Sequence, residues 1–128
     1  MEQKPHYRLD VWRKSIELVK VIYDVTKQLP SEERFSLTNQ MRGAAISIAS
    51  NIAEGAGRRS NAEKLNFFHM ARGSLTELDT QIEICVVLTY INSEQRKPVQ
   101  EQMDLVGRLL HGLIKSRQPL KISSPQLT

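Results

Sequence analysis

Cysteine is nearly absent from this 128-residue sequence, which contains only Cys85. A single cysteine cannot form an internal disulfide or a cysteine pair for zinc, so disulfide-rich secreted domains and cysteine-based zinc modules are excluded. No apolar run reaches the ~18 residues that a membrane span needs, and the first ten residues contain no apolar signal-peptide core. We therefore expect a soluble, cytoplasmic protein that makes no membrane contact.

Residues suited to catalysis or metal binding are also scarce. His6, His69 and His111 are far apart in the sequence, and none belongs to a Glu-x-x-His pair like those that bind di-iron centres in helical bundles. Cys85 lies on an apolar helix face, which favours a small core residue. Residues 55–60 resemble a phosphate loop only faintly, because they follow a predicted helix and lack the Gly-Lys-Ser/Thr ending. We expect no catalytic residues, no metal and no cofactor.

Apolar residues are sufficient for one core, since 40% of the sequence is hydrophobic and 25% is charged. A chain of this length forms one domain that buries about two-thirds of its unfolded surface. The 18 lysines and arginines exceed the 14 acidic residues and give a net charge of +4. This mild excess permits binding to nucleic acid or to an acidic membrane surface without requiring either.

The spacing of apolar residues predicts four helices. The first is expected from about residue 10 to residue 28, with Asp10 as its N-cap and with Pro30 disfavouring further helix. The second is expected from about residue 37 to residue 56, with Ser36 as its N-cap. The broad apolar face of the first helix indicates contact with at least two other helices.

The third predicted helix begins at a capping box formed by Ser60 and Glu63 and continues to about Tyr90. Residues 82–91 are apolar nearly all round, a pattern that a strand would also explain. Continuity with the preceding residues favours a helix that is covered on several sides, with another subunit covering part of it.

The fourth predicted helix has a late or irregular start, marked by Pro98, and ends near Lys115. Four helices joined by short loops predict an all-α fold, an antiparallel up-down four-helix bundle spanning residues 9–116. Residues 1–8 are predicted to be an N-terminal arm. Residues 117–128 contain two prolines and no periodicity, so we predict a disordered tail.

The second helix also carries a polar stripe of short side chains at helical spacing: Ser47, Ser50, Asn51 and Glu54. Two interpretations stay open: the stripe packs inside one chain, or it lines a subunit interface or a central channel. Both are structural roles, which we favour over ligand binding. Glu77 of the third helix is expected near the stripe or paired with a basic residue such as Arg42 or Arg72.

The candidate nucleic-acid-binding residues are basic: Arg42, Arg58, Arg59, Lys64 and Arg72. Arg58 and Arg59 precede the N-terminus of the third helix, where free N–H groups and the helix dipole favour an anion. Alternatively, these arginines cap the preceding helix and pair with Glu54 or Glu63. Aromatic residues are few, so we expect binding through the nucleic-acid backbone, sensitive to salt and poor in sequence specificity.

Several segments carry a resemblance to a known family: LDVW (9–12), LTNQMR (37–42), SNIAEG (50–55), GR (57–58) and GSLTEL (73–78). Over roughly residues 9–91 the sequence resembles the 23S rRNA intervening-sequence protein family, also called the S23 or four-helix-bundle protein family. The resemblance assigns a structural or interface role to the motif residues: Ser50, Asn51, Glu54, Gly55, Gly73 and Glu77. Ala49 departs from the family, in which many members carry proline there, so a straighter second helix is expected.

The resemblance implies a small bundle, encoded in some bacteria within insertions in ribosomal RNA genes. Relatives include the accessory variability determinant of diversity-generating retroelements, a ring-like pentamer with a basic surface associated with nucleic acid and a reverse transcriptase. A ring-like homo-oligomer, with a pentamer suspected, is therefore implied here. We expect a non-enzymatic oligomeric bundle that binds structured RNA or DNA through a repeated basic surface. The alternative is a protein-interaction scaffold or accessory subunit, for example for a reverse transcriptase, without direct nucleic-acid function.

Overall fold

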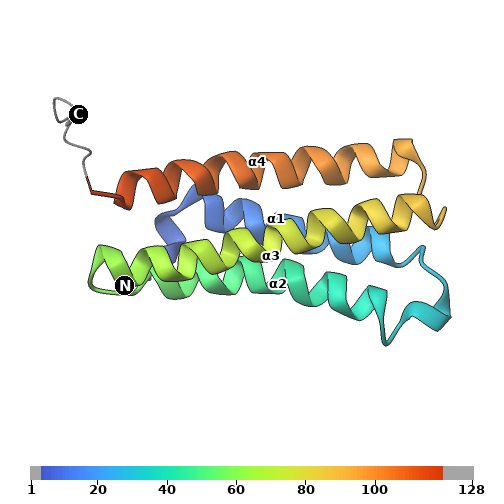
Figure 1. The fold of residues 1–128 in the computed structure, drawn as a ribbon, viewed down its shortest axis with the longest axis horizontal. Coiled ribbons are helices and arrows are strands. Elements are labelled where there is room, and N and C mark those ends of the chain that lie inside the picture. Colours follow the sequence, from blue (N-terminus) through green and yellow to red (C-terminus); the bar gives the residue numbers. More distant parts are fainter. Residues whose placement is uncertain (1–3, 120–128) are drawn as a thin grey trace, which may run out of the picture.

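A computed structural model describes residues 4–119 and shows, in that range, an all-helical chain without strands. Its elements in order are two short 3-10 helices and four α-helices: η1 (Pro5–Arg8), α1 (Asp10–Thr26), η2 (Ser31–Glu33), α2 (Leu37–Ala56), α3 (Asn61–Val87) and α4 (Ser93–Arg117). The four long helices lie side by side along one axis, with successive helices antiparallel (Figure 1). The predicted four-helix bundle is confirmed.

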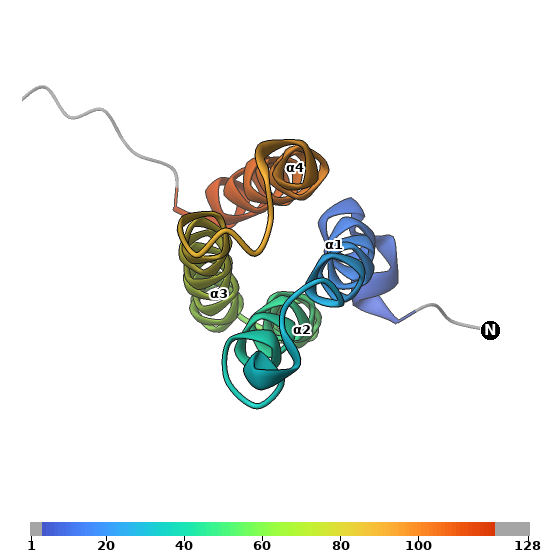
Figure 2. The same ribbon diagram turned by 90° about the vertical axis from the view of Figure 1, so that its right-hand side faces the viewer.

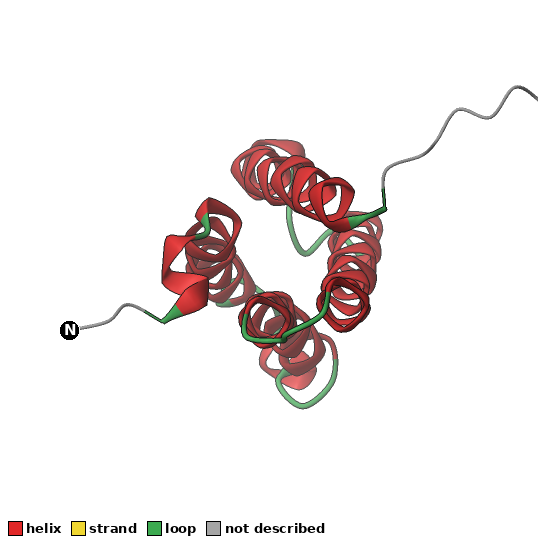
Figure 3. Cartoon of the chain, turned by 90° about the vertical axis from the view of Figure 1, so that its left-hand side faces the viewer, coloured by secondary structure: helices red, strands yellow, loops and turns green. Residues whose placement is uncertain are grey.

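The end-on views show the helices around a square in chain order (Figures 2 and 3). Each helix packs against its two neighbours, and within residues 4–119 neither diagonal pair makes close backbone contact. The predicted contact of α1 with two helices is thus confirmed, since α1 packs on both α2 and α4. Of the predicted disordered tail, residues 120–128 lie outside the described residues, and Arg117 belongs to α4.

The limits of α1 differ slightly from the prediction. Leu9 is its N-cap, and Asp10 is instead the first helical residue. The helix ends at Thr26, two residues early. For α2 the predicted limits are confirmed, and Ser36 is the N-cap. The Ser36 hydroxyl nevertheless makes no capping bond to the helix, because it donates to Oε1 of Glu33 at 2.6 Å.

The start of α3 is confirmed in detail. Ser60 Oγ accepts a hydrogen bond from the Glu63 N–H at 3.1 Å, and Glu63 Oε1 accepts one from the Ser60 N–H at 3.4 Å. Two orphan donors of the helix N-terminus are thereby satisfied. The end of α3 was predicted too late, because the helix stops at Val87 rather than Tyr90.

The predicted late start of α4 is wrong. Asn92 is the N-cap of a second capping box, in which Asn92 and Gln95 exchange two bonds of 2.8 Å between side chain and backbone. The helix therefore begins at Ser93, and Pro98 lies inside it. Proline lacks an N–H, so the Glu94 carbonyl one turn earlier loses its usual intrahelical partner. Local capping by Asn92 outweighs this loss.

All four helices contribute buried apolar residues to one core. On α2 and α3 the predicted faces are confirmed, except that Leu75 is only partly buried. Ile16 and Tyr23 of α1 were expected in the core but are exposed. The largest fully buried side chains include Leu18, Ile22, Met41, Ile48, Ile52, Phe68, Leu78 and Ile82. Within residues 4–119, no helix is long and apolar enough to cross a membrane.

Candidate nucleic-acid interface

Cationic side chains gather at the end of the bundle where η1, the α2–α3 turn and the C-terminus of α4 meet, on the left in Figure 1. Of the predicted basic residues, Arg58, Arg59 and Lys64 lie at this end. Residues from distant parts of the sequence join them. We call the whole set the basic end: Lys4, Arg8, Arg58, Arg59, Lys64, Lys115 and Arg117.

Two of these cations also hold the local structure. The Arg58 guanidinium lies 3.8 Å from the Glu54 carboxylate and 4.5 Å from the centre of the Phe67 ring. The Lys64 ammonium donates to the Ala56 carbonyl at 3.0 Å and satisfies a C-terminal carbonyl of α2. The predicted pairing of an arginine with Glu54 is therefore present. This exposed pair adds little stability, and a guanidinium retains further N–H donors for a phosphate.

The N-terminus of α3 already holds a negative charge. The Glu63 carboxylate accepts hydrogen bonds from the N–H and the hydroxyl of Ser60, at 3.4 and 3.1 Å. The Glu63 carboxylate therefore interacts with the helix dipole at the place where a bound anion was predicted. A phosphate at the basic end is therefore better placed against the arginine side chains than on this helix terminus.

Arg42 lies apart from the basic end and joins α2 to α1. Its guanidinium donates to Thr26 Oγ1 at 2.9 Å and to the Tyr23 carbonyl at 3.3 Å, and it lies 4.4 Å from the centre of the Tyr23 ring. Arg42 and Arg58 are sixteen positions apart, a separation that corresponds to about 24 Å in a helix. The structure therefore places Arg42 in the α1–α2 contact and not on the same surface as Arg58.

Arg72 lies midway along α3 and is exposed. Its guanidinium is 2.8 Å from Nδ1 of His69. Because a guanidinium only donates, Nδ1 of His69 is the acceptor of this hydrogen bond. Arg72 is thus separated along the bundle from Arg58 and Arg59, so the predicted basic set is only partly brought together.

The polar stripe of α2 divides between two surroundings. Ser47 Oγ lies 2.9 Å from Ser74 Oγ of α3, and the Asn51 amide donates to the carbonyl and the hydroxyl of Ser47 at 2.9 and 3.0 Å. These residues pack inside the chain and fix how α2 lies against α3. Ser50 and Glu54 are exposed instead.

The remaining motif residues also differ in their surroundings. Gly55 is buried where α2 meets α3, whereas Gly73 is exposed and a Cβ there would meet nothing within 4 Å. Packing within this chain therefore does not require glycine at position 73. Glu77 accepts a hydrogen bond from the Gln81 amide at 3.1 Å, so the expected pairing with Arg42 or Arg72 is replaced by a contact on its own helix.

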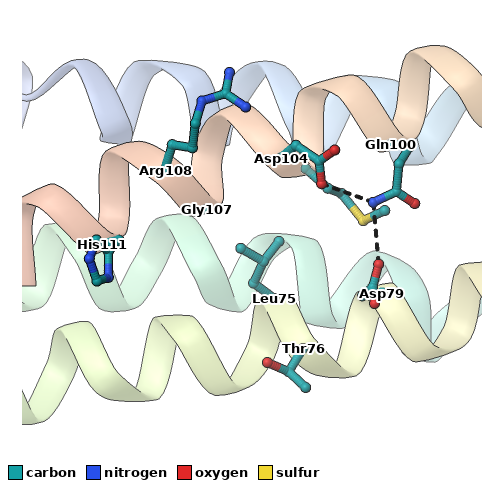
Figure 4. Close-up of a pocket in the computed structure, with 9 residues that line it drawn as sticks. Leu75, Thr76, Asp79, Gln100, Asp104, Gly107, Arg108 and His111 are labelled. Atoms are coloured by element: carbon teal, nitrogen blue, oxygen red, sulfur yellow. Dashed lines mark hydrogen bonds between the residues drawn. The ribbon is translucent and has the colours of Figure 1, made fainter.

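A groove of about 700 Å³ lies between α3 and α4, and sequence reasoning missed it (Figure 4). The Gln100 amide donates to Asp104 at 3.0 Å and to Asp79 at 3.4 Å, while Arg108 and His111 line another part of the groove. The mixture of carboxylates and cations suits a nucleic-acid backbone poorly. No spacing in either helix signals this groove, because its residues meet only when α3 packs on α4.

No metal centre is formed by the residues that the structure describes, since no three His, Cys, Asp or Glu side chains there are grouped to hold an ion. Cys85 is buried, and its Sγ donates to Met41 Sδ at 3.6 Å. Burial, and secondly the charge of Glu33, raise the pKa of the Cys85 thiol to about 11. A thiol with this pKa is a poor nucleophile at neutral pH, which fits the predicted role as a core residue.

Comparison with known proteins agrees with the four-helix fold. The model of the family described as 23S rRNA-intervening sequence protein matches residues 7–112. A crystal structure of a protein with unknown function from the S23 ribosomal protein family of Bacteroides thetaiotaomicron is 27% identical, with a TM-score of 0.75. That similarity covers 82% of this chain and 98% of the other chain. No curated protein matches. From the matched residues and the shared bundle we conclude that the chain belongs to the 23S rRNA-intervening sequence protein family.

Proposed function

We propose that this protein is a non-enzymatic helical bundle that binds structured RNA or DNA through the basic end. The observation that carries the proposal is that η1, the α2–α3 turn and the end of α4, which meet at one end of the bundle (Figure 1), each contribute cationic residues. Such a concentration of positive charge attracts phosphates and releases their counterions. Arg58 and Arg59 are its most exposed predicted members, since Lys64 is half-buried.

Recognition through stacked bases has little support at this end. The aromatic rings near η1 are occupied with one another: His6 lies 4.9 Å from Tyr7 and 4.8 Å from Trp12, and Tyr7 stacks on Trp12 at 5.2 Å. Binding is therefore expected to follow the phosphate backbone, with strong salt dependence and weak sequence preference.

We also propose self-association through the exposed face of α3. Val87 is 70% exposed in the isolated chain, Met70 and Ile84 are exposed on the same helix, and the C-cap residue Leu88 is exposed beside them. Exposed apolar side chains grouped in this way are typical of an interface. A ring, expected to be a pentamer in the bacterial cytoplasm, would repeat the basic end in each subunit and raise the affinity by multivalency.

The proposal is tested by measuring binding to duplex DNA, structured RNA and single strands over a salt series, with the solution mass recorded on the same sample. Arg58→Ala with Arg59→Ala should lower the affinity at low salt and reduce the salt slope by about two for each bound chain. The matched control is Arg34→Ala with Lys97→Ala, which removes equal charge at the opposite end of the bundle. Equal affinity for both double variants would contradict a role for the basic end.

The second candidate is a protein-interaction scaffold or accessory subunit, for example for a reverse transcriptase. Phe35, 87% exposed just before α2, favours it, because a large aromatic ring held in water is typical of a contact site. Absence of nucleic-acid binding at physiological salt, with the oligomer intact, would favour the scaffold. Elemental and cofactor analysis of the purified protein tests the proposed lack of enzymatic chemistry.

A further inference from the structure

A small cavity of about 220 Å³ lies within the basic end. Its walls come from η1, the last turn of α2, the first turns of α3 and the last turns of α4. Cationic side chains line it from three of these elements: Arg8, Lys64 and Arg117. Among the residues that the structure describes, no acidic side chain lines it.

The rest of the lining is apolar. Leu9, Phe68 and Leu113 contribute to it, and Phe68 is only 1% exposed. An apolar wall lowers the local dielectric constant, so a charge interaction in this cavity is stronger than one on an open surface. The cavity therefore places cationic side chains from three elements beside an apolar wall.

Within the described part of the chain, these cations take part in no ion pair. Arg8 and Arg117 form no ion pair with any residue in the range 4–119, whereas Arg13, Arg58 and Arg96 each pair with a carboxylate. The Lys64 ammonium donates one N–H to the Ala56 carbonyl, and its two other N–H groups remain as donors. An anion in the cavity would meet two guanidinium groups and one ammonium.

We propose that this cavity binds a phosphomonoester. A terminal phosphate carries a charge of about −1.5 to −2 at pH 7 and three acceptor oxygens, which suits a cavity lined by three cations better than a singly charged phosphodiester does. The volume equals about seven water molecules at ~30 Å³ each, enough for a phosphate and the first atoms attached to it. Leu9 and Leu113 then contact the attached carbon atoms.

Two sources present the same chemistry: the phosphorylated end of a nucleic-acid strand and a small free phosphomonoester. The inference goes beyond the proposed function, because Arg58 and Arg59 would bind internal phosphates of any strand, with or without a terminal phosphate. Only Lys64 belongs to both the predicted basic set and the cavity.

The experiment is calorimetric titration of the full chain with matched probes. One pair is a short RNA hairpin with a 5′-phosphate and the same hairpin with a 5′-hydroxyl, and the other is adenosine 5′-monophosphate and adenosine. We expect the phosphorylated member of at least one pair to bind about tenfold tighter or more. Arg8→Gln with Arg117→Gln should abolish this difference. Arg34→Gln with Arg108→Gln, which removes the same charge from exposed sites elsewhere, should retain it.

A preference confined to the hairpins identifies a strand end as the source, and a preference confined to the nucleotides identifies a small metabolite; both support the cavity. Equal binding within both pairs overturns the inference, as does a preference that survives Arg8→Gln with Arg117→Gln. Circular dichroism confirms that the variants are folded. The proposed function is tested separately by the 5′-hydroxyl hairpin, whose binding should weaken steeply with salt and be reduced by Arg58→Ala with Arg59→Ala. Either proposal can therefore fail while the other holds.

Discussion

The ring of Phe68 on α3 packs directly against the Cα of Gly55 on α2. A Cβ added at position 55 would lie 2.6 and 2.8 Å from two carbons of this ring and 3.1 Å from the Lys64 carbonyl oxygen. Real Cβ atoms do not come so close, so glycine is required for the two helices to approach here. The same contact positions Lys64 at the basic end, which gives the glycine of the SNIAEG motif a physical role.

Gly55→Ala is expected to destabilise the fold by about 1–3 kcal/mol, because Phe68 is fully buried and cannot move freely. This outcome opposes helix propensity, which favours alanine over glycine by up to ~1 kcal/mol. The matched control is Gly43→Ala on the same helix, where a Cβ meets nothing within 4 Å and stability should rise. Urea unfolding measures both, and equal shifts in the same direction would contradict the contact.

Arg42→Ala is expected to lower stability by about 1–2 kcal/mol through loss of the hydrogen bonds and the ring contact that join α2 to α1. Affinity for nucleic acid should stay unchanged within about twofold. Arg59→Ala, an exposed substitution at the basic end, should show the reverse pattern. A loss of binding by the folded Arg42 variant, as large as that of the Arg59 variant, would place Arg42 in the interface.

Thr89→Gly is expected to stabilise the protein by about 1 kcal/mol. Thr89 follows the C-cap of α3 with φ of 62°, a left-handed conformation that is unfavourable for a β-branched residue. Thr80→Gly, the same substitution in the exposed middle of α3, should destabilise by a few tenths to ~1 kcal/mol. Thermal unfolding distinguishes the two, and a lower midpoint for Thr89→Gly would show that the strain is absent.

The hydrogen bond between Tyr90 and Glu33 is expected to make a pH-dependent contribution to the free energy of unfolding. The Ser36 hydroxyl and then the Tyr90 hydroxyl, which donates at 2.7 Å, lower the pKa of Glu33 below 4.5. The same bond raises the pKa of Tyr90 above 10.0. The contribution is therefore lost as pH falls through the lowered pKa of Glu33 or rises through the raised pKa of Tyr90.

Tyr90→Phe removes the bond between these two side chains while keeping the ring. The difference in unfolding free energy between the wild type and this variant should be largest between pH 4.5 and 10.0 and should shrink on both sides. Urea titrations across this range measure the difference. A difference that is constant with pH would mean that the bond contributes nothing through ionisation.

Cys85 should react very slowly with thiol reagents in the folded protein. With its pKa raised to about 11, roughly 0.1% of the thiol is ionised at pH 8, and its side chain is fully buried. Labelling should become fast in guanidinium chloride, where burial is lost. Rapid labelling under native conditions would show that this part of the core opens readily.

Local sequence signals predicted the four helices, the limits of α2 and the capping box at Ser60 and Glu63. These features depend on residues within one or two turns, so the pattern alone determines them. The end of α3 and the start of α4 were predicted at the wrong residues, and the causes are also local. The end of α3 has the hydrogen bonds of a glycine cap but carries Thr89, and the start of α4 is governed by Asn92 although Pro98 follows.

Only the tertiary structure decided which cationic residues share a surface. The sequence analysis grouped Arg42 with Arg58, but the packing of α2 on α1 binds Arg42 to Thr26, whereas Arg58 lies at the basic end beside Glu54. Arg8 and Arg117 are more than a hundred positions apart, yet they line one cavity with Lys64. Periodicity determines which face of a helix is apolar, because it repeats along the chain. The order and rotation of packed helices depend on contacts such as Phe68 against Gly55, which no single segment contains.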